Sequence, residues 1–336
     1  MTSFYRPILK KALKISFKNK WLWVLGFCAA FIGNGGVYEA LLRSFGNISD
    51  GRSVFYTLKE YSESGILGMM SWAKLHALWT TDMSAFGMSI FTMLVLLALL
   101  ALLISFGVMG QAGLIRSVID IEEKKTNLKK SFKIGVERFW PVLELNVLTK
   151  VILFGFLLLL SYLASLILVG NPLIDIAIYI ASFIVFIVFG IIIYFLTIYG
   201  TAFTVLRNHG PFRALRDAWR LFRKNVMLNI EMGLILFIIN AIAVIAFFVS
   251  CFILLAPFVL LYFLLILAAA QTAITVLGII MMIVFLVILV LFGAWYCTFQ
   301  LGVWAILFEE LHANGGQSKT GRLIDAIKNR KPKKKK

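Results

Sequence analysis

An uninterrupted apolar stretch constrains this chain more than any other feature. Residues 232–308 form a run of 77 positions without a single Asp, Glu, Lys or Arg. About 20 mainly apolar residues cross a bilayer core as one helix, so this run is too long for one span. Pro257 and the polar pair Gln271-Thr272 divide it. We therefore expect two long helices with a turn near residues 268–272, although three spans would also fit by length.

Four more apolar segments are candidates for membrane spans. They cover residues 21–37, which is short, and residues 85–110, 151–170 and 176–206. Hydrophobic residues make up 61% of the 336-residue chain and charged residues only 15%, whereas soluble domains contain about 25% charged residues. The composition excludes a soluble enzyme and a disordered chain. It predicts an all-α, polytopic integral membrane protein.

Lys and Arg residues are concentrated in alternate segments between the apolar runs. The segment 38–84 holds four of them, and 29 lie in the segments on the other side: 1–20, 111–150, 207–231 and 309–336. Because cytoplasmic loops carry the excess of Lys and Arg, we expect both termini to be cytoplasmic in a cell-membrane protein. Six spans satisfy this pattern, whereas a third span in 232–308 would place nine basic tail residues outside. A signal peptide at 21–37 is the alternative, but its basic leader is long for one.

A basic amphipathic segment precedes each odd-numbered span, and the three segments align without gaps at offsets of 115 and 87 residues. The matched positions are Leu13, Leu128 and Leu215; Phe17, Phe132 and Trp219; Lys18, Lys133 and Arg220; and, in two copies, Glu144 and Glu231. A truncated fourth copy lies at residues 323–328. Internal repetition of this kind predicts repeated structural units. We expect three, each a basic in-plane helix followed by a helical hairpin, at residues 1–127, 128–210 and 211–310, before a basic tail at 311–336.

The third of these leader segments is the most regular. Phe212, Leu215, Trp219 and Phe222 recur at spacings of three and four, which places them on one face of a helix. Pro211 suits the first turn. The other faces carry Arg213, Arg216, Arg220, Arg223 and Lys224. Such a helix is expected to lie at the level of the lipid headgroups with its apolar side down.

The basic residues of the leaders are therefore candidate sites for headgroups of the anionic inner leaflet or for an unidentified protein partner. They are Lys18, Lys133, Arg213, Arg216, Arg220, Arg223 and Lys224. Each Lys or Arg near an anionic leaflet contributes about 1 kcal/mol. Two alternatives stay open: the leaders only guide membrane insertion, or they pack against the bundle as elbow helices without a ligand.

Polar side chains inside apolar runs are candidates for functional positions because they are costly there. They are Glu144, Lys150, Glu231, Asn240, Gln271 and Gln300. We expect Lys150 to reach the inner interface or to pair with Glu231. We expect the amides, including Asn146 and Asn229, to form hydrogen bonds between helices.

No constellation of catalytic, metal-binding or cofactor-binding residues is visible in the sequence. Three His and three Cys residues are too few and too scattered for a metal site or a redox framework. No phosphate-binding glycine loop or nucleophile–base set occurs. The Lys-rich C-terminus has the charge for nucleic acid, but the anionic leaflet is the nearer partner. We expect neither an enzyme nor a nucleic-acid-binding protein.

Residues 200–225, with the sequence GTAFTVLRNHGPFRALRDAWRLFRKN, resemble a known family. They are similar to the link between the fourth and fifth spans in the membrane-domain family of glycerophosphoryl diester phosphodiesterase and in related prokaryotic six-helix families without assigned function. The resemblance implies a six-helix membrane fold. Where that family has a catalytic part, it is a separate soluble barrel of about 250 residues, for which this chain has no room. No activity or catalytic residue carries over.

Two functions follow from these features. The first is a non-enzymatic membrane module that binds anionic lipid or a cytoplasmic partner through the basic helices. The alternative is a transporter or channel-like protein that moves a small solute or lipid. A polar cavity lined by Asn240, Gln271 or Gln300 would favour the alternative, and a filled centre would oppose it. The external segment 38–84 is the piece large enough to recognise something outside, and it is expected to include an in-plane helix.

Overall fold

The computed structural model describes residues 4–32, 72–121, 126–167 and 172–313, and these ranges contain helices and no β-strand. The all-α prediction is therefore confirmed for this part of the chain. The short helices are α1 (Tyr5–Lys18), α2 (Leu22–Ala30), α6 (Trp72–Thr81), α8 (Leu128–Glu137) and α11 (Pro211–Lys224). The long helices are α7 (Met83–Asp120), α9 (Phe139–Ile167), α10 (Pro172–Arg207), α12 (Val226–Leu267) and α13 (Gln271–Ala313).

Five of the described helices are long and apolar enough to cross a membrane. They are α7, α12 and α13 over their full lengths, residues Phe139–Leu160 of α9 and residues Ile174–Arg207 of α10. The chain is thus a helical protein of membrane type. The sixth expected span, residues 21–37, coincides with α2 over only nine residues, and its residues 33–37 lie outside the described ranges. That span stays a prediction.

The long uncharged run folds as two helices with one turn, as predicted. α12 ends at Leu267 and α13 begins at Gln271. Between them Ala269 has a φ of 52°, a left-handed conformation that commonly ends a helix. Pro257, which was expected to help divide the run, lies inside α12 and does not end it.

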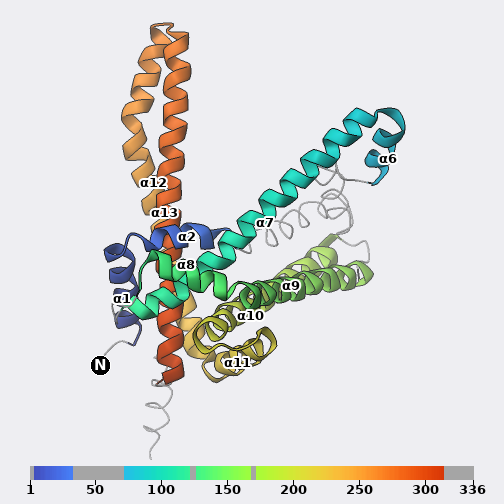
Figure 1. Cartoon of the computed structure of the whole chain (residues 1–336), viewed down its shortest axis with the longest axis vertical. Coiled ribbons are helices and arrows are strands. Elements are labelled where there is room, and N and C mark those ends of the chain that lie inside the picture. The colour runs from blue at the N-terminus through green and yellow to red at the C-terminus, as the bar shows by residue number, and fades with distance from the viewer. Residues whose placement is uncertain (1–3, 33–71, 122–125, 168–171, 314–336) are drawn as a thin grey trace, which may run out of the picture.

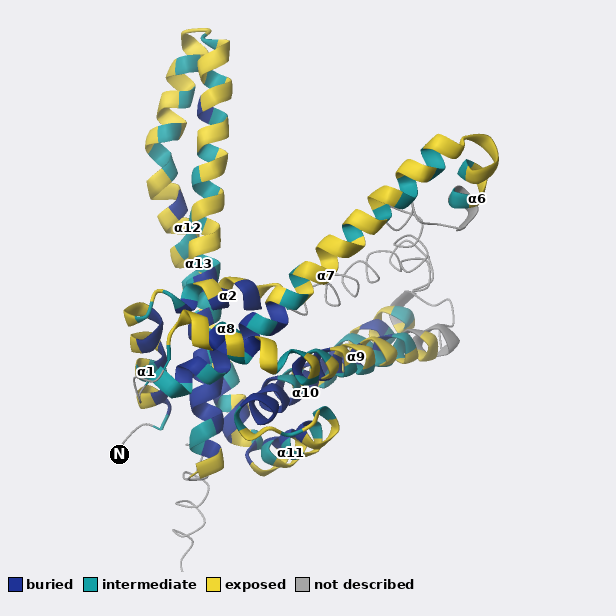
Figure 2. Cartoon of the chain, in the orientation of Figure 1, coloured by how far each residue is buried: buried dark blue, intermediate teal, exposed yellow. Residues whose placement is uncertain are grey.

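Most buried side chains lie in one region, which we call the base. It contains α1, α2, α8, α11, the C-terminal parts of α7, α10 and α13, and the N-terminal parts of α9 and α12. Figure 2 shows the buried residues gathered there. Leu114, Tyr199, Leu228 and Phe308 are among its fully buried side chains.

Three arms leave the base in different directions: the α12/α13 hairpin, the N-terminal part of α7, and the α9/α10 pair (Figure 1). Their large apolar side chains are mostly exposed; Phe91, Phe237 and Phe252 are examples. A smaller core of Leu153, Leu157, Phe186 and Ile193 joins α9 to α10. Continuous apolar surface of this extent marks a membrane-embedded region.

The short helices bind the long ones together at the base. α2 packs between α7 and α13. A Cβ added at Gly26 would lie 2.4 Å from the carbonyl oxygen of Ala294, so only glycine allows this approach of α2 to α13. α8 packs on α7, α11 packs on α10, and α1 packs on α13.

Several sequence predictions fall on residues outside the described ranges. These are the external segment 38–84 up to residue 71, the tail from residue 314 and the truncated fourth repeat at 323–328. Residues Trp72–Thr81 of the external segment form α6, which packs on the start of α7. Trp79 of α6 and Phe86 of α7 meet edge to face, with 5.0 Å between their ring centroids.

Candidate functional site

The third leader segment forms α11, which has Pro211 in its first turn, as its sequence predicts. It packs on α10 through small side chains. Ala214 and Ala218 are fully buried and Phe222 is nearly so, and the Phe222 ring lies 5.2 Å from that of Phe195 on α10. These positions repeat every four residues and so form one stripe. Small residues in such a stripe allow two helix axes to come close.

The aromatic stripe of α11 is separate from this buried stripe. Phe212 is 75% exposed and Trp219 is 40% exposed, and Leu215 is half-buried. Of the four residues expected on the apolar face, only Phe222 belongs to the core. Since successive residues of an α-helix are turned by about 100°, Leu215, Phe212 and Trp219 lie beside the buried stripe rather than on it.

The basic face of α11 is the third face of the helix. Arg213, Arg216, Arg220, Arg223 and Lys224 are all exposed. Arg213 and Arg220 lie on either side of Asp217, with N–O distances of 3.8 Å and 3.5 Å. Exposed pairs of this kind contribute little energy, so both guanidinium groups stay available to an external anion.

Asp217 connects α11 to the loop that precedes it. Its carboxylate lies 3.0 Å from Nδ1 of His209. The His209 ring stacks on Phe203 of α10, with 5.5 Å between the ring centroids. His209, in the short connection between α10 and α11, thus contacts both helices. These two contacts help to orient the aromatic and basic faces of α11 relative to the base.

The first two leaders form α1 and α8, and Lys18 and Lys133 are exposed on them. α8 approaches α7 closely, because a Cβ at Gly135 would lie 2.4 Å from the carbonyl oxygen of Met109. The hydroxyl of Ser117 on α7 donates a hydrogen bond to that of Ser131 on α8. Each of the three leader helices therefore packs on a long helix through one of its faces.

Most of these helices lie in a region of the chain that matches a known protein family. A family described as a domain of unknown function, DUF7847, matches residues 62–299. The chain belongs to this family. No curated protein and no solved structure gives a match. The DUF7847 region contains α6 to α12 and α13 as far as Phe299, and therefore includes two of the three leader helices.

The ionisable candidates of the DUF7847 region are not gathered into one site. Glu231 of α12 accepts a hydrogen bond from the hydroxyl of Tyr5 on α1, so it joins two elements of the base. Glu144 and Lys150 lie exposed on α9. Within the described residues Lys150 forms no ion pair, and the expected pair between Lys150 and Glu231 is absent.

The amide candidates of the DUF7847 region and of the end of α13 are also dispersed. Gln300 donates to the hydroxyl of Tyr194 on α10 at 3.3 Å, and Asn229 accepts from the Tyr199 hydroxyl at 2.5 Å. These two form hydrogen bonds between helices, as predicted. Asn240 is exposed on α12 and Gln271 is exposed at the hairpin turn.

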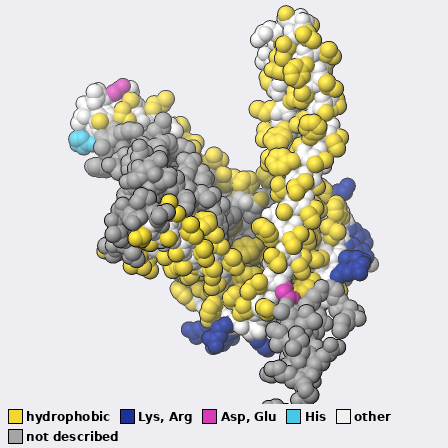
Figure 3. All heavy atoms as spheres, turned by 180° about the vertical axis from the view of Figure 1, so that it is seen from behind, with side chains coloured by type: hydrophobic (Ala, Val, Ile, Leu, Met, Phe, Trp, Pro, Cys, Tyr) yellow, Lys and Arg dark blue, Asp and Glu magenta, His cyan; other side chains and the backbone are white. Residues whose placement is uncertain are grey.

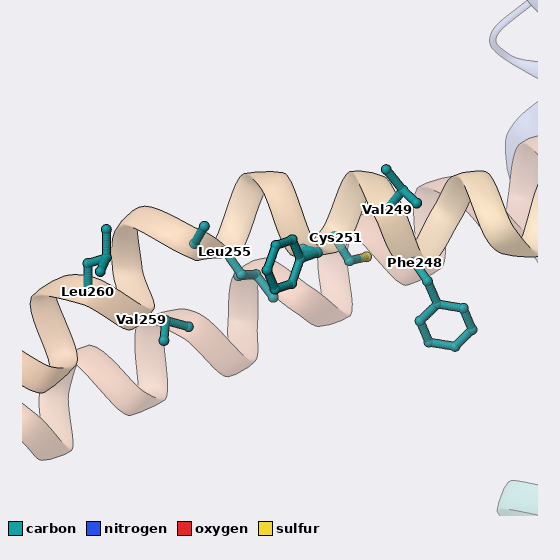
Figure 4. A pocket seen from close by; sticks show the side chains of 8 residues that line it. Phe248, Val249, Cys251, Leu255, Val259 and Leu260 are labelled. Carbon is teal, nitrogen blue, oxygen red and sulfur yellow. The ribbon is translucent and has the colours of Figure 1, made fainter.

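The centre of the base, where α7, α10 and α13 meet, is filled by side chains. It leaves no room for a water molecule and is lined by Gln111, Ile115, Ile198, Ala202, Leu301, Trp304 and Ala305. An open groove of about 800 Å³ runs along α12, and its lining is apolar, from Phe248 to Leu260 (Figure 4). Among the described residues, no group of three His, Cys, Asp or Glu side chains is placed to hold a metal ion.

Proposed function

We propose that this protein is a non-enzymatic integral membrane module that binds anionic phospholipids of the cytoplasmic leaflet through α1, α8 and α11. Six spans and cytoplasmic termini are part of the proposal. The observation that carries it is the division of α11 into three faces. Ala214, Ala218 and Phe222 attach the helix to α10, whereas Phe212, Trp219 and the arginines remain exposed.

The exposed faces of α11 match the two layers of a membrane interface. An aromatic and aliphatic face enters the boundary between headgroups and acyl chains, and an adjacent basic face meets the phosphates. Each basic residue near an anionic surface contributes about 1 kcal/mol. Attachment of α11 to α10 fixes its orientation beforehand, so lipid binding does not have to restrict the motion of a free helix.

The distribution of charge over the molecule supports the same placement. Figure 3 shows Lys and Arg side chains around the base, while hydrophobic side chains cover the arms. In a bilayer the arms would occupy the hydrocarbon and the base would lie at the inner interface, where the basic residues are expected. The leaders would then lie at headgroup depth.

A binding measurement on the full-length, detergent-purified chain tests this proposal. Fluorescently labelled phosphatidylglycerol is titrated, and unlabelled phosphatidylglycerol and phosphatidylcholine compete. We expect the preference for phosphatidylglycerol at α11 to fall by several hundred-fold when Arg213, Arg216, Arg220 and Arg223 are all changed to Gln, since about 1 kcal/mol per charge corresponds to roughly 5-fold and four charges multiply to about 600-fold.

The matched control changes the same four arginines to Lys. It keeps the four positive charges on α11, so its preference should stay within about 3-fold of the original. Equal lipid preference in the original chain and the arginine variant would contradict the proposal. The transporter alternative has less support, because the centre of the base is filled.

A further inference from the structure

The three leader helices share a six-residue pattern that adds further matched positions to the repeat. It reads LKISFK at residues 13–18, LKKSFK at 128–133 and LRDAWR at 215–220. The shared pattern is leucine, a basic residue, any residue, a small residue, an aromatic residue and a basic residue. We call it the leader motif.

Burial at the five shared positions of the leader motif follows one pattern in all three helices. The small residue, Ser16, Ser131 or Ala218, is fully buried. The leucine and the aromatic residue are exposed or half-buried in every copy, and both basic residues are exposed in every copy. Packing inside the chain accounts fully for the small residue and for part of the aromatic side chain in two copies. The two basic residues and the leucine are left largely to the surroundings of the protein.

The geometry of a helix brings the four shared residues other than the small one into two adjacent pairs. The leucine and the aromatic residue are four apart, as are the two basic residues, so each pair lies one turn apart with about 5–6 Å between Cβ atoms. Lys129 and Lys133, for example, can direct both ammonium groups to one phosphate. Leu128 and Phe132 lie beside them, where an acyl chain would begin. One motif therefore suits one anionic phospholipid.

The helices that carry the motifs occupy comparable places. α8 packs on α7, α11 packs on α10 and α1 packs on α13, and those three long helices meet at the centre of the base. The motif aromatic contacts the supporting long helix in two copies: Phe17 lies 5.2 Å from Trp295, and Phe132 lies 6.4 Å from Phe106, between ring centroids. The base thus presents the motif once on each of its central helices.

We propose that the chain binds three anionic phospholipids, one at each leader motif, and that the three sites act separately. This inference rests on the proposed lipid binding and adds the number of lipids and the residues that hold each one. For the three sites these basic pairs are Lys14 with Lys18, Lys129 with Lys133, and Arg216 with Arg220.

Native mass spectrometry of the full-length chain in detergent, with phosphatidylglycerol added, tests the number of sites. We expect three retained lipids for the original chain, two when any one basic pair is changed to Gln, and none when all three pairs are changed. The matched control is K10Q/K20Q, which removes two exposed charges of the first unit that lie outside the motif; it should retain three. K14R/K18R should also retain three, because it preserves the charges.

The outcomes separate this inference from the function on which it rests. If changing one pair removes every lipid, or if no single pair matters while the triple change removes all, the three separate sites are refuted and lipid binding remains. If the triple variant retains as many lipids as the original chain, both proposals fail. Displacement of phosphatidylglycerol by equimolar glycerol phosphate would show sites for soluble phosphate and would overturn the lipid assignment.

Discussion

Asn146 of α9 donates a hydrogen bond from Nδ2 to Oε1 of Gln111 on α7, with 3.0 Å between the two atoms. Both side chains are buried, and Nδ2 of Asn146 also donates to the carbonyl oxygen of Val142 at 2.9 Å. This polar contact joins α9 to α7 between two buried side chains.

Replacing Asn146 with Leu leaves Oε1 of Gln111 buried without this donor. We expect a loss of about 0.6–1.7 kcal/mol, between the average and the maximum measured for side-chain hydrogen bonds within a membrane protein, and a lower midpoint of thermal unfolding in detergent. The control is N240L, because Asn240 is exposed on α12. An equal change in both variants would show that the contact with Gln111 contributes nothing specific.

A methyl group at Gly135 should separate α8 from α7. The added Cβ would lie 2.4 Å from the carbonyl oxygen of Met109, and backbone atoms cannot move aside without shifting a helix. Overpacking of this kind costs about 1–3 kcal/mol, so G135A should unfold at lower temperature. G278A is the control, since nothing lies within 4 Å of a Cβ there; it should be neutral or slightly stabilising. A neutral G135A would contradict the close packing of α8.

The ion pair between Arg207 and Glu309 joins the ends of α10 and α13 at 2.8 Å. Its side chains are 38% and 37% exposed, so solvent screens it. A double-mutant cycle with R207Q and E309Q should give a coupling free energy below about 1 kcal/mol that decreases as salt is raised. A coupling above about 2 kcal/mol would mean that the pair is far better shielded than its exposure indicates.

Asp82 caps the first turn of α7, and this cap should depend on pH. The hydroxyl of Ser84 and the amides of Ala85 and Ser84 bond to the carboxylate and lower the pKa of Asp82 below its ordinary value. A lowered pKa means that the carboxylate stabilises the folded turn above its unfolded pKa of about 4, and that this contribution is lost as pH falls through the folded value.

Hydrogen exchange at the amides of Ser84 and Ala85, corrected for the intrinsic effect of pH, measures the state of this cap. Protection should be constant near neutral pH and should fall below about pH 4. D82N retains a capping oxygen but has no titrating group, so its protection should not change over the same range. The same acid-induced loss in D82N would assign the effect to another group.

The sequence was sufficient to predict features that depend on local pattern or on total length. Pro211 marks the start of α11, and the uncharged run at 232–308, together with the basic tail, predicted two long helices joined by one turn. The repeated basic leaders were likewise visible, because their matched residues stand at constant offsets.

The packing face of α11 could not be predicted from its own residues. Ala214 and Ala218 are less apolar than Phe212 and Trp219, so a periodicity of hydrophobic residues favours the wrong stripe; the partner surface on α10 decides which stripe is buried. Gln111 was missed for a related reason, since its partner Asn146 lies 35 residues away. The filled centre of the base could not be predicted either, because it depends on contacts among α7, α10 and α13, which lie far apart in the sequence.

The lengths of α12 and α13 have a mechanical consequence. Their 42 and 43 residues extend about 63 Å at 1.5 Å per residue, about twice the thickness of a hydrocarbon core. Part of each helix is held in the base, and the remainder leaves it as a separate arm. A thicker or thinner bilayer can then be accommodated by pivoting of the arms, while the base keeps its shape.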